Sequence, residues 1–260
     1  MKVVGVGTVC IDYYPKLNRY YATGNGVDFV IHLSRFGMET SIVSMVGTDS
    51  YGKLMIDTLG EKGVDTSHIR IREGKTAVVQ MDLNGRDRVH GAFDAGVMDQ
   101  FSLTQDDVEF ILRHDMIHVD MDCRIFELLP MFHEKGKKIV FDFSVRLKDP
   151  SVQNLLRSVD YAFFSYNQKD PYILDFVKWA KSCGPQIVTV TLGPNGSLSY
   201  DGKNIYESGP MPAKVVNTVG AGDSFIAGFM SGIINGKGIE ESMKKGTETA
   251  TKVIQIFNPY

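Results

Sequence analysis

Short runs of β-branched and other apolar residues alternate along this chain with longer stretches in which apolar residues recur at helical spacing. This alternation is typical of an α/β fold, and it predicts a mostly parallel central sheet covered by helices on both faces. No repeat, low-complexity run or linker interrupts the pattern, so we expect a single domain over residues 1–260. The predicted strands are Val3 to Val9, Ile42 to Val46, Met116 to Met121, Lys138 to Phe143, Tyr161 to Ser165 and Gln186 to Leu192. The predicted helices are Asp28 to Arg35, Tyr51 to Lys62, Gln105 to His114 (capped by Thr104), Phe126 to Lys135 and Pro171 to Ser182.

Two segments break this alternation with a strand, a tight turn and a return strand. Thr76 to Leu83 alternates apolar and polar residues, and Arg86 to Phe93 is its predicted return strand. Asn84-Gly85 between them is the strongest signal for a two-residue hairpin turn. A second hairpin is predicted to turn at Asp201-Gly202.

A hairpin inserted early in an α/β chain is typical of a lid rather than of a core strand. We therefore expect a small β-sheet lid built from residues 10–25 and 70–95. The apolar face of such a lid needs a cover, which is either the substrate cleft or another subunit, and we expect a homodimer through this sheet.

The overall composition excludes several classes of function. A hydrophobic content of 43% and a charged content of 23% are ordinary for a globular protein, and a net charge of −3 predicts no nucleic-acid surface. The three cysteines form no Cys-x-x-Cys pair and the histidines show no ligand spacing, so no disulfide framework or zinc site is indicated. His118, on a predicted strand, is expected to be a core residue with satisfied ring nitrogens. Without a signal peptide or a long apolar run, we expect a cytoplasmic protein that does not bind membranes.

Small residues lead into an acidic residue at the start of a predicted helix. Gly220, Ala221 and Gly222 precede Asp223, and an apolar run at helical spacing follows. Backbone N–H groups and the positive end of the helix dipole favour a phosphate at such a position. Because the charge of Asp223 is wrong for holding a phosphate, we interpret it as the acceptor of a proton from an attacking hydroxyl. The alternative is a glycine-rich turn in which Asp223 only helps to cap the helix.

The whole string Asn217 to Phe225 resembles the signature Asp-Thr-x-Gly-Ala-Gly-Asp-x-Phe of the PfkB (ribokinase-like) carbohydrate kinases, and differs from it only at Asn217. This resemblance implies a ribokinase-like three-layer α/β/α fold and an enzyme that transfers the γ-phosphoryl group of ATP to a sugar hydroxyl, with Mg²⁺ as the metal. Asp223 would be the catalytic base, and Gly220, Ala221 and Gly222 would form the anion site. Many relatives bind a monovalent cation partly through the aspartate that Asn217 replaces, so we predict weak or absent activation by potassium.

Further family landmarks on the acceptor side follow in the same order along the chain. Gly5-x-Gly7 followed by Asp12 resembles the opening strand, whose aspartate binds sugar hydroxyls, and a Rossmann dinucleotide site is excluded because the third glycine is missing. Gly24, Asn25 and Asp28 stand where the family has the Gly-Gly-x-x-x-Asn segment that lines the sugar pocket. An N-cap role is the alternative for Asp28. Arg88, in the predicted lid, is a further candidate for substrate binding.

The nucleotide side of the resemblance rests on three strings. Asp142-Phe143-Ser144-Val145-Arg146 resembles Asp-x-Asn-x-Arg, whose arginine would reach a phosphate. Ser165 to Asp170 resembles the Asn-x-x-Glu element, so Asn167 would bind near the nucleotide and Asp170 would hold Mg²⁺ through water. Thr191, Gly193 and Gly196 match the nucleotide-binding Thr-Leu-Gly-x-x-Gly string, and the chain contains no Walker A motif.

Within the family the chain is most similar to the short bacterial fructoselysine 6-kinases, which implies phosphorylation of the primary 6-hydroxyl of fructoselysine or a related fructosamine. Asp120 and Asp122 are candidates to receive the amine of such a substrate, and solvent-exposed loop carboxylates are the alternative. A kinase of the same family that acts on another sugar or a nucleoside stays open. A non-catalytic sugar- or nucleotide-binding regulator is the remaining alternative, against which the intact Asp223 argues.

Overall fold

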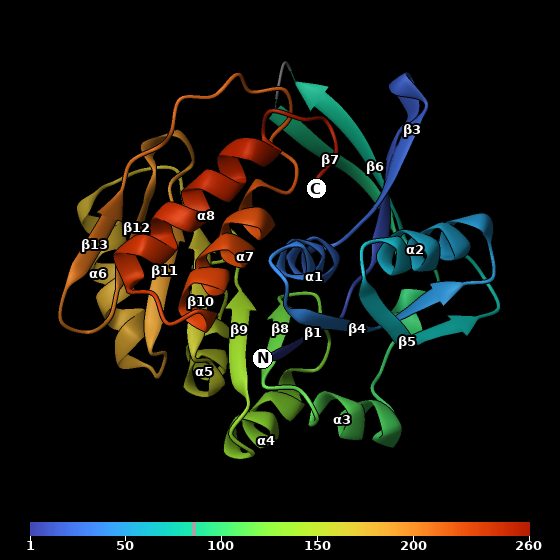
Figure 1. The fold of residues 1–260 in the computed structure, drawn as a ribbon, viewed down its shortest axis with the longest axis horizontal. Coiled ribbons are helices and arrows are strands. Elements are labelled where there is room, and N and C mark those ends of the chain that lie inside the picture. The colour runs from blue at the N-terminus through green and yellow to red at the C-terminus, as the bar shows by residue number, and fades with distance from the viewer. Residues whose placement is uncertain (85–86) are drawn as a thin grey trace.

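The structure of the chain is a computed structural model that describes residues 1–84 and 87–260 (Figure 1). A nine-stranded sheet in the order β13-β12-β11-β10-β9-β8-β1-β4-β5 forms its centre. All neighbours in this sheet pair in parallel except β11–β12 and β12–β13, which are antiparallel. The β12–β13 pair is the predicted hairpin at Asp201-Gly202. The strands are β1 (Lys2–Val6), β4 (Glu39–Gly47), β5 (Val64–Arg72), β8 (Met116–Asp120), β9 (Lys138–Asp142), β10 (Tyr161–Ser165), β11 (Ile187–Thr191), β12 (Ser197–Tyr200) and β13 (Ile205–Ser208).

Helices cover both faces of this sheet, which confirms the predicted three-layer α/β/α fold (Figure 1). One face carries α1 (Asn25–Arg35), α2 (Ser50–Glu61), α7 (Ala221–Ile234) and α8 (Ile239–Val253). The other face carries α3 (Gln105–Ile111), α4 (Leu129–Glu134), α5 (Val152–Leu155) and α6 (Pro171–Ser182). Short 3₁₀ helices are η1 (Pro15–Leu17), η2 (Gly96–Gln100), η3 (Phe126–Leu128), η4 (Leu156–Ser158) and η5 (Gly193–Asn195). Among the described residues no helix is long and apolar enough to cross a membrane.

A four-stranded sheet in the order β3-β2-β6-β7 stands beside the C-terminal edge of the central sheet (Figure 1). Its strands are β2 (Cys10–Tyr14), β3 (Arg19–Thr23), β6 (Val78–Asn84) and β7 (Asp87–Asp94). The predicted hairpin is present as the antiparallel pair β6–β7, in which Asn84 opposes Asp87. Its turn residues, Gly85 and Arg86, lie outside the described residues. The small sheet is not purely antiparallel, contrary to what we expected for a hairpin lid, because β2 pairs with β6 in parallel.

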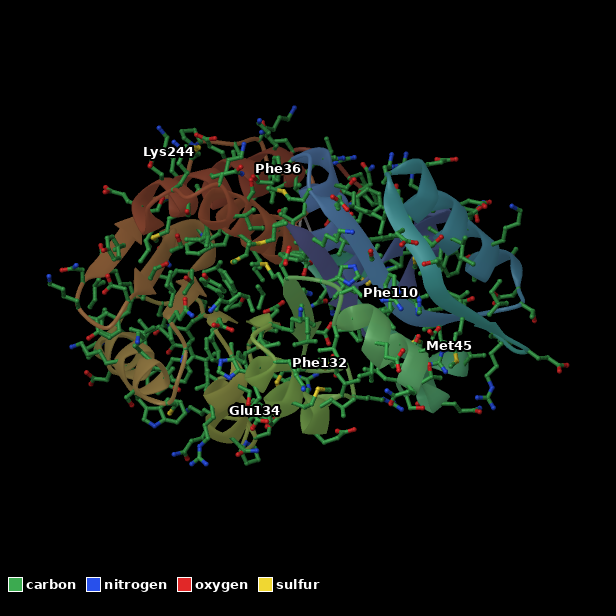
Figure 2. All side chains as sticks on the ribbon, turned by 60° about the horizontal axis from the view of Figure 1, so that its bottom comes forward. Phe36, Met45, Phe110, Phe132, Glu134 and Lys244 are labelled. Atoms are coloured by element: carbon green, nitrogen blue, oxygen red, sulfur yellow. The ribbon has the colours of Figure 1, made fainter. Side chains whose placement is uncertain are left out.

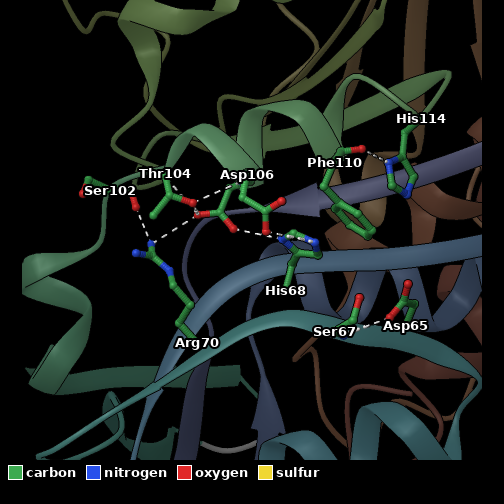
Figure 3. Close-up of polar contacts among 10 residues, drawn as sticks. Asp65, Ser67, His68, Arg70, Ser102, Thr104, Asp106, Phe110 and His114 are labelled. Atoms are coloured by element: carbon green, nitrogen blue, oxygen red, sulfur yellow. Dashed lines mark hydrogen bonds and ion pairs between the residues drawn. The ribbon is translucent and has the colours of Figure 1, made fainter.

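The edge strand β5 was not predicted, because its charged residues hide its strand pattern. Its side chains form a polar network with the start of α3 (Figure 3). His68 Nδ1 lies 3.0 Å from Asp107 Oδ1, and Arg70 contacts the Ser102 carbonyl and the Asp107 carboxylate. Asp107 and Thr104 also form the predicted capping box, in which the Thr104 side chain accepts from the Asp107 N–H group.

The helix predicted from Phe126 to Lys135 is divided into η3 and α4, because Pro130 near the start of α4 cannot donate a backbone hydrogen bond. In α4, Phe132 is buried in the core while Glu134 lies at the surface (Figure 2). Helix α1 begins at Asn25 after the N-cap residue Gly24, so the interpretation of Asp28 as the N-cap is wrong. Asp28 lies in the first turn instead.

His118 in the middle of β8 is a core residue, as expected, but its ring nitrogens are not satisfied. Within the part of the chain that the structure describes, neither ring nitrogen has a hydrogen-bond partner. The strand neighbours are Gly5 and Val140, and the ring stacks on Phe29 with 4.2 Å between centroids, so the surroundings are apolar. Burial therefore lowers the pKa of His118 to about 3, and the imidazole is neutral at physiological pH.

Candidate active site

The predicted anion site is the start of α7. Gly220 is the N-cap residue with φ 71°, a left-handed conformation that favours glycine. A Cβ atom on Gly220 would lie 2.7 Å from the Pro259 carbonyl oxygen, so the residue also permits close backbone packing. A Cβ atom on Gly222 would meet open space. The N-cap residue supplies no side-chain hydrogen bond to α7, which leaves the end of the helix open to an anion.

Asp223 occupies the first turn of α7 and is half-buried. Gly220 is the N-cap residue of α7, so Asp223 is not the N-cap itself, and its role as catalytic base stays a prediction. The Asp223 charge contributes to raised pKa values of both Cys10 and Asp120, so its carboxylate lies near the ends of β2 and β8.

The predicted acceptor-side residues lie at the start of α1 and on β2. Asp12 on β2 is buried, and the buried Asp28 accepts hydrogen bonds from the Thr23 hydroxyl at 3.0 and 2.9 Å. Gly24 has φ 138°, and a Cβ atom there would lie 2.6 Å from the Thr8 carbonyl oxygen, so this glycine is required by the backbone itself. Arg88 belongs to β7, but its side chain is outside the described residues.

Asp120 and Asp142, the acidic pair, end the neighbouring strands β8 and β9 and stand opposite each other in register. Residues opposite each other in parallel strands point to the same face of the sheet. Asn25 reaches this pair from α1, and its Nδ2 donates to Asp142 Oδ2 at 3.0 Å. Burial, together with the charges of Asp122, Asp142 and Asp223, raises the pKa of Asp120 to about 7.

The two acidic residues of the Asp-Met-Asp string lie in different environments. Asp120 is buried and accepts the Asp122 backbone N–H at 2.7 Å. Asp122 is 65% exposed and pairs with Arg146 at 3.0 Å. The alternative of a solvent-exposed carboxylate is therefore confirmed for Asp122 and is wrong for Asp120. Arg146, which we expected to reach a phosphate, holds this ion pair in the structure.

The predicted nucleotide-side residues line the ends of β10 and β11. Thr191 Oγ1 lies 3.1 Å from Ser165 Oγ, and Gly193 and Gly196 flank the turn that leads into β12. The Asn167 carbonyl accepts from Asn195 Nδ2 at 3.0 Å. Asn167 also lines a cavity of about 690 Å³, whose other lining residues include Arg146, Lys148, Tyr166 and Tyr172.

Asp170, the predicted metal residue, is the N-cap of α6. Its Oδ1 accepts from the Ile173 N–H at 3.0 Å and its Oδ2 from the Tyr166 hydroxyl at 3.1 Å. A carboxylate oxygen has two lone pairs, so each oxygen keeps one for a water molecule. The carboxylate is thus still able to accept a further contact, and its water-mediated binding of Mg²⁺ stays a prediction.

Residues 257–260 were not predicted to belong to the site, and no motif marks them. Pro259 packs directly on Gly220, and the Phe257 carbonyl accepts from Asn217 Nδ2 at 2.9 Å. The contact between Asn25 and Asp142 was also missed, although Asp142 ends a strand at the edge where ligands bind in open α/β sheets.

Comparison with known proteins agrees with this geometry. The sequence model of the pfkB family carbohydrate kinases matches residues 6–259. The chain is 37% identical to a fructoselysine 6-kinase of Shigella flexneri over 98% of both chains. It is 29% identical to a fructosamine kinase of Bacillus subtilis, covering 100% of this chain and 93% of the relative. The ribokinase of Arabidopsis thaliana complexed with ribose and ATP has a TM-score of 0.83 at 21% identity, covering 99% of this chain and 93% of the other. The chain therefore belongs to the pfkB family of carbohydrate kinases and is an ATP-dependent phosphotransferase with a sugar as acceptor.

Proposed function

We propose that this kinase phosphorylates the primary 6-hydroxyl of a fructosamine, with fructoselysine as the preferred acceptor. The observation that carries the proposal is the buried Asp120, which lies near Asp223 and in register with Asp142. The relatives named fructoselysine 6-kinase and fructosamine kinase support the same substrate class. The amine of a fructosamine is cationic and can pair with a buried carboxylate. Free fructose and ribose have no amine to make this contact.

In the proposed reaction the acceptor hydroxyl attacks the γ-phosphorus in line with the bond to ADP. Asp223 accepts the hydroxyl proton as the new oxygen–phosphorus bond forms and ADP leaves. The N–H groups at Gly220 and Gly222 stabilise the charge on the transferred group, whereas the Ala221 N–H donates to the Thr218 carbonyl at 3.3 Å.

Substrate and nucleotide would lie on opposite sides of this loop. Asp12, Asn25 and Asp28 hold the sugar hydroxyls, with Gly24 giving the backbone its approach and Arg88 contributing from the small sheet. Thr191, Gly193, Gly196 and Asn167 hold the nucleotide at the ends of β10 and β11. Asp170 would hold Mg²⁺ through water, and the bound ion would offset the negative charge of the phosphates.

The small sheet would act as the lid of a single kinase domain and as the contact between two subunits. By the strand register, Tyr20 and Val89 lie on one face of this sheet, and they are 49% and 43% exposed. Phe93, which is 54% exposed, lies on the opposite face with Asp12. We expect light scattering to give twice the chain mass, and Val89→Glu to give the mass of one chain. A monomeric wild-type protein would contradict the dimer and leave the kinase proposal intact.

A screen of ADP release tests the acceptor. Fructoselysine, free fructose, ribose and a nucleoside are compared in parallel by kcat/KM, and the phosphorylated carbon is identified by NMR. We expect fructoselysine to have the highest kcat/KM and its C6 to carry the phosphate. If ribose, fructose or a nucleoside equals it, the proposed specificity is wrong.

A further inference from the structure

Residues 257–260, the bridging segment, lie between the small sheet and the anion site (Figure 1). The segment follows α8 and passes the start of α7, where Pro259 packs against Gly220. Because this contact joins backbone to backbone, a shift of the segment displaces the N-cap of α7 directly.

Asn217 fixes the bridging segment to the anion site. Its side chain is fully buried, and its Nδ2 donates to the Phe257 carbonyl at 2.9 Å and to the Tyr14 hydroxyl at 3.3 Å. Its Oδ1 accepts from the Val219 N–H at 3.1 Å. One amide side chain thus binds the anion site, the bridging segment and strand β2 together.

Phe257 fixes the same segment to the small sheet. Its ring packs edge-on against Tyr14 of β2 with 5.1 Å between centroids, and lies 5.9 Å from the ring of Tyr21 on β3. The Arg19 guanidinium stands 5.1 Å from the ring centroid in a cation–π arrangement. Two strands of the small sheet therefore share one aromatic anchor.

The end of the segment has two further attachments. The Tyr260 hydroxyl donates to the Ala22 carbonyl on β3 at 2.6 Å. His32 Nε2 on α1 lies 3.3 Å from the Pro259 carbonyl oxygen, to which it donates as a neutral imidazole. The segment is thus tied to α1, to β3 and to the start of α7.

We propose that Asn217 and Phe257 are positioning residues that couple the small sheet to the anion site, so that the acceptor and ATP strengthen each other's binding. An acceptor held by Asp12 on β2 and by Asp28 beside β3 fixes these two strands. Phe257 transmits their position to the backbone at Val219 and Gly220, where the phosphates bind. The coupling is reciprocal, because linked binding equilibria must be. The inference rests on the proposed function only for the identity of the acceptor.

Hydrogen exchange without ligands tests the mechanical part. Phe257→Ala is compared with Ile256→Ala, a truncation of the neighbouring residue, whose side chain is 41% exposed. In Phe257→Ala we expect faster exchange of amides in both β2–β3 and residues 218–223, with β10 unchanged. Ile256→Ala should resemble the wild type. Faster exchange in only one of the two regions, or throughout the protein, would show that no such coupling exists.

Calorimetry tests the binding part. The affinity for a non-hydrolysable ATP analogue is measured with and without saturating fructoselysine. For the wild type and Ile256→Ala we expect at least about fivefold tighter binding with acceptor, the lower end of typical coupling. In Phe257→Ala this factor should fall to near one, whatever the change in the affinity without acceptor. An unchanged factor in Phe257→Ala would overturn the proposal. If fructoselysine fails to bind the wild type, the acceptor is wrong, and the exchange experiment decides the coupling alone.

Discussion

Replacing Asp120 by asparagine should stabilise the protein and impair its substrate preference at the same time. Asp120 is buried at the end of β8, and its pKa is raised from 3.8 to about 7. The folded state therefore binds more protons than the unfolded state between these values. Its contribution to the free energy of unfolding is fully present below pH 3.8 and is lost as the pH rises through about 7.

The size of the effect follows from the two pKa values. At 1.36 kcal/mol per pKa unit, the raised pKa of Asp120 costs the folded state about 4 kcal/mol at pH 8, where the side chain is ionised, and about 2 kcal/mol at pH 5, where the folded state keeps it protonated. An asparagine side chain at this position would carry no charge and would keep an oxygen that accepts the Asp122 N–H. Asp120→Asn should therefore raise the free energy of unfolding, and by more at pH 8 than at pH 5.

Denaturant unfolding at both pH values measures this gain, with Asp122→Asn as the matched control. Asp122 is exposed and paired with Arg146, so its replacement should change stability by less than about 1 kcal/mol at either pH. In kinetics, Asp120→Asn should lower kcat/KM for fructoselysine by a factor that corresponds to about 1–3 kcal/mol, with little change for free fructose. A stability gain that does not depend on pH, or a loss, would refute the assignment of Asp120 as a buried and destabilised carboxylate.

Three further changes test the other parts of the site. Asp223→Asn should lower turnover by ~10²–10⁴-fold with ATP affinity retained, and a near wild-type rate would contradict a role as base. Potassium in place of sodium should leave kcat nearly unchanged, because Asn217 is uncharged and donates to the Phe257 carbonyl and the Tyr14 hydroxyl; a large activation would overturn this. His118→Leu should raise the free energy of unfolding by about 1–3 kcal/mol near pH 7, since two unsatisfied ring nitrogens are removed. The gain should grow as the pH falls below 6.5, because burial lowers the pKa of His118 to about 3 and its protonation favours the unfolded state; equal gains at pH 7 and pH 4 would contradict it.

Where local sequence decides the structure, prediction from the sequence succeeds. Helix α6 and strand β10 have their predicted bounds, because Asp170-Pro171 starts the helix and a buried apolar run defines the strand. Helix α8 was missed because the face that it packs on α7 is built from small and polar residues rather than apolar ones. Gly228 and Gly232 of α7 bring the two helices close at Thr249 and Ser242.

The site could be predicted only where it depends on motifs. The anion site and the acceptor-side residues lie within short strings that the sequence shows directly. The bridging segment contributes through contacts over 200 residues apart in sequence, such as that of Phe257 with Tyr14. The sequence of this segment shows no periodic pattern and no turn signal. Its packing depends instead on which surfaces the fold brings together.

The acidic character of the site adds a reason why binding of the two substrates should be coupled. Asp12, Asp28, Asp120, Asp142 and Asp223 place negative charge beside the anion site, which must also take ATP, itself an anion. A cationic amine on the acceptor offsets part of this charge before the phosphates arrive, whereas a neutral sugar does not. Asn217, in place of the family's aspartate, further reduces the negative charge beside the same loop. Discrimination between fructoselysine and free fructose should therefore appear in the KM for ATP as well as in the KM for the acceptor. An ATP KM that is the same with both acceptors would mean that the acidic residues act on the acceptor alone.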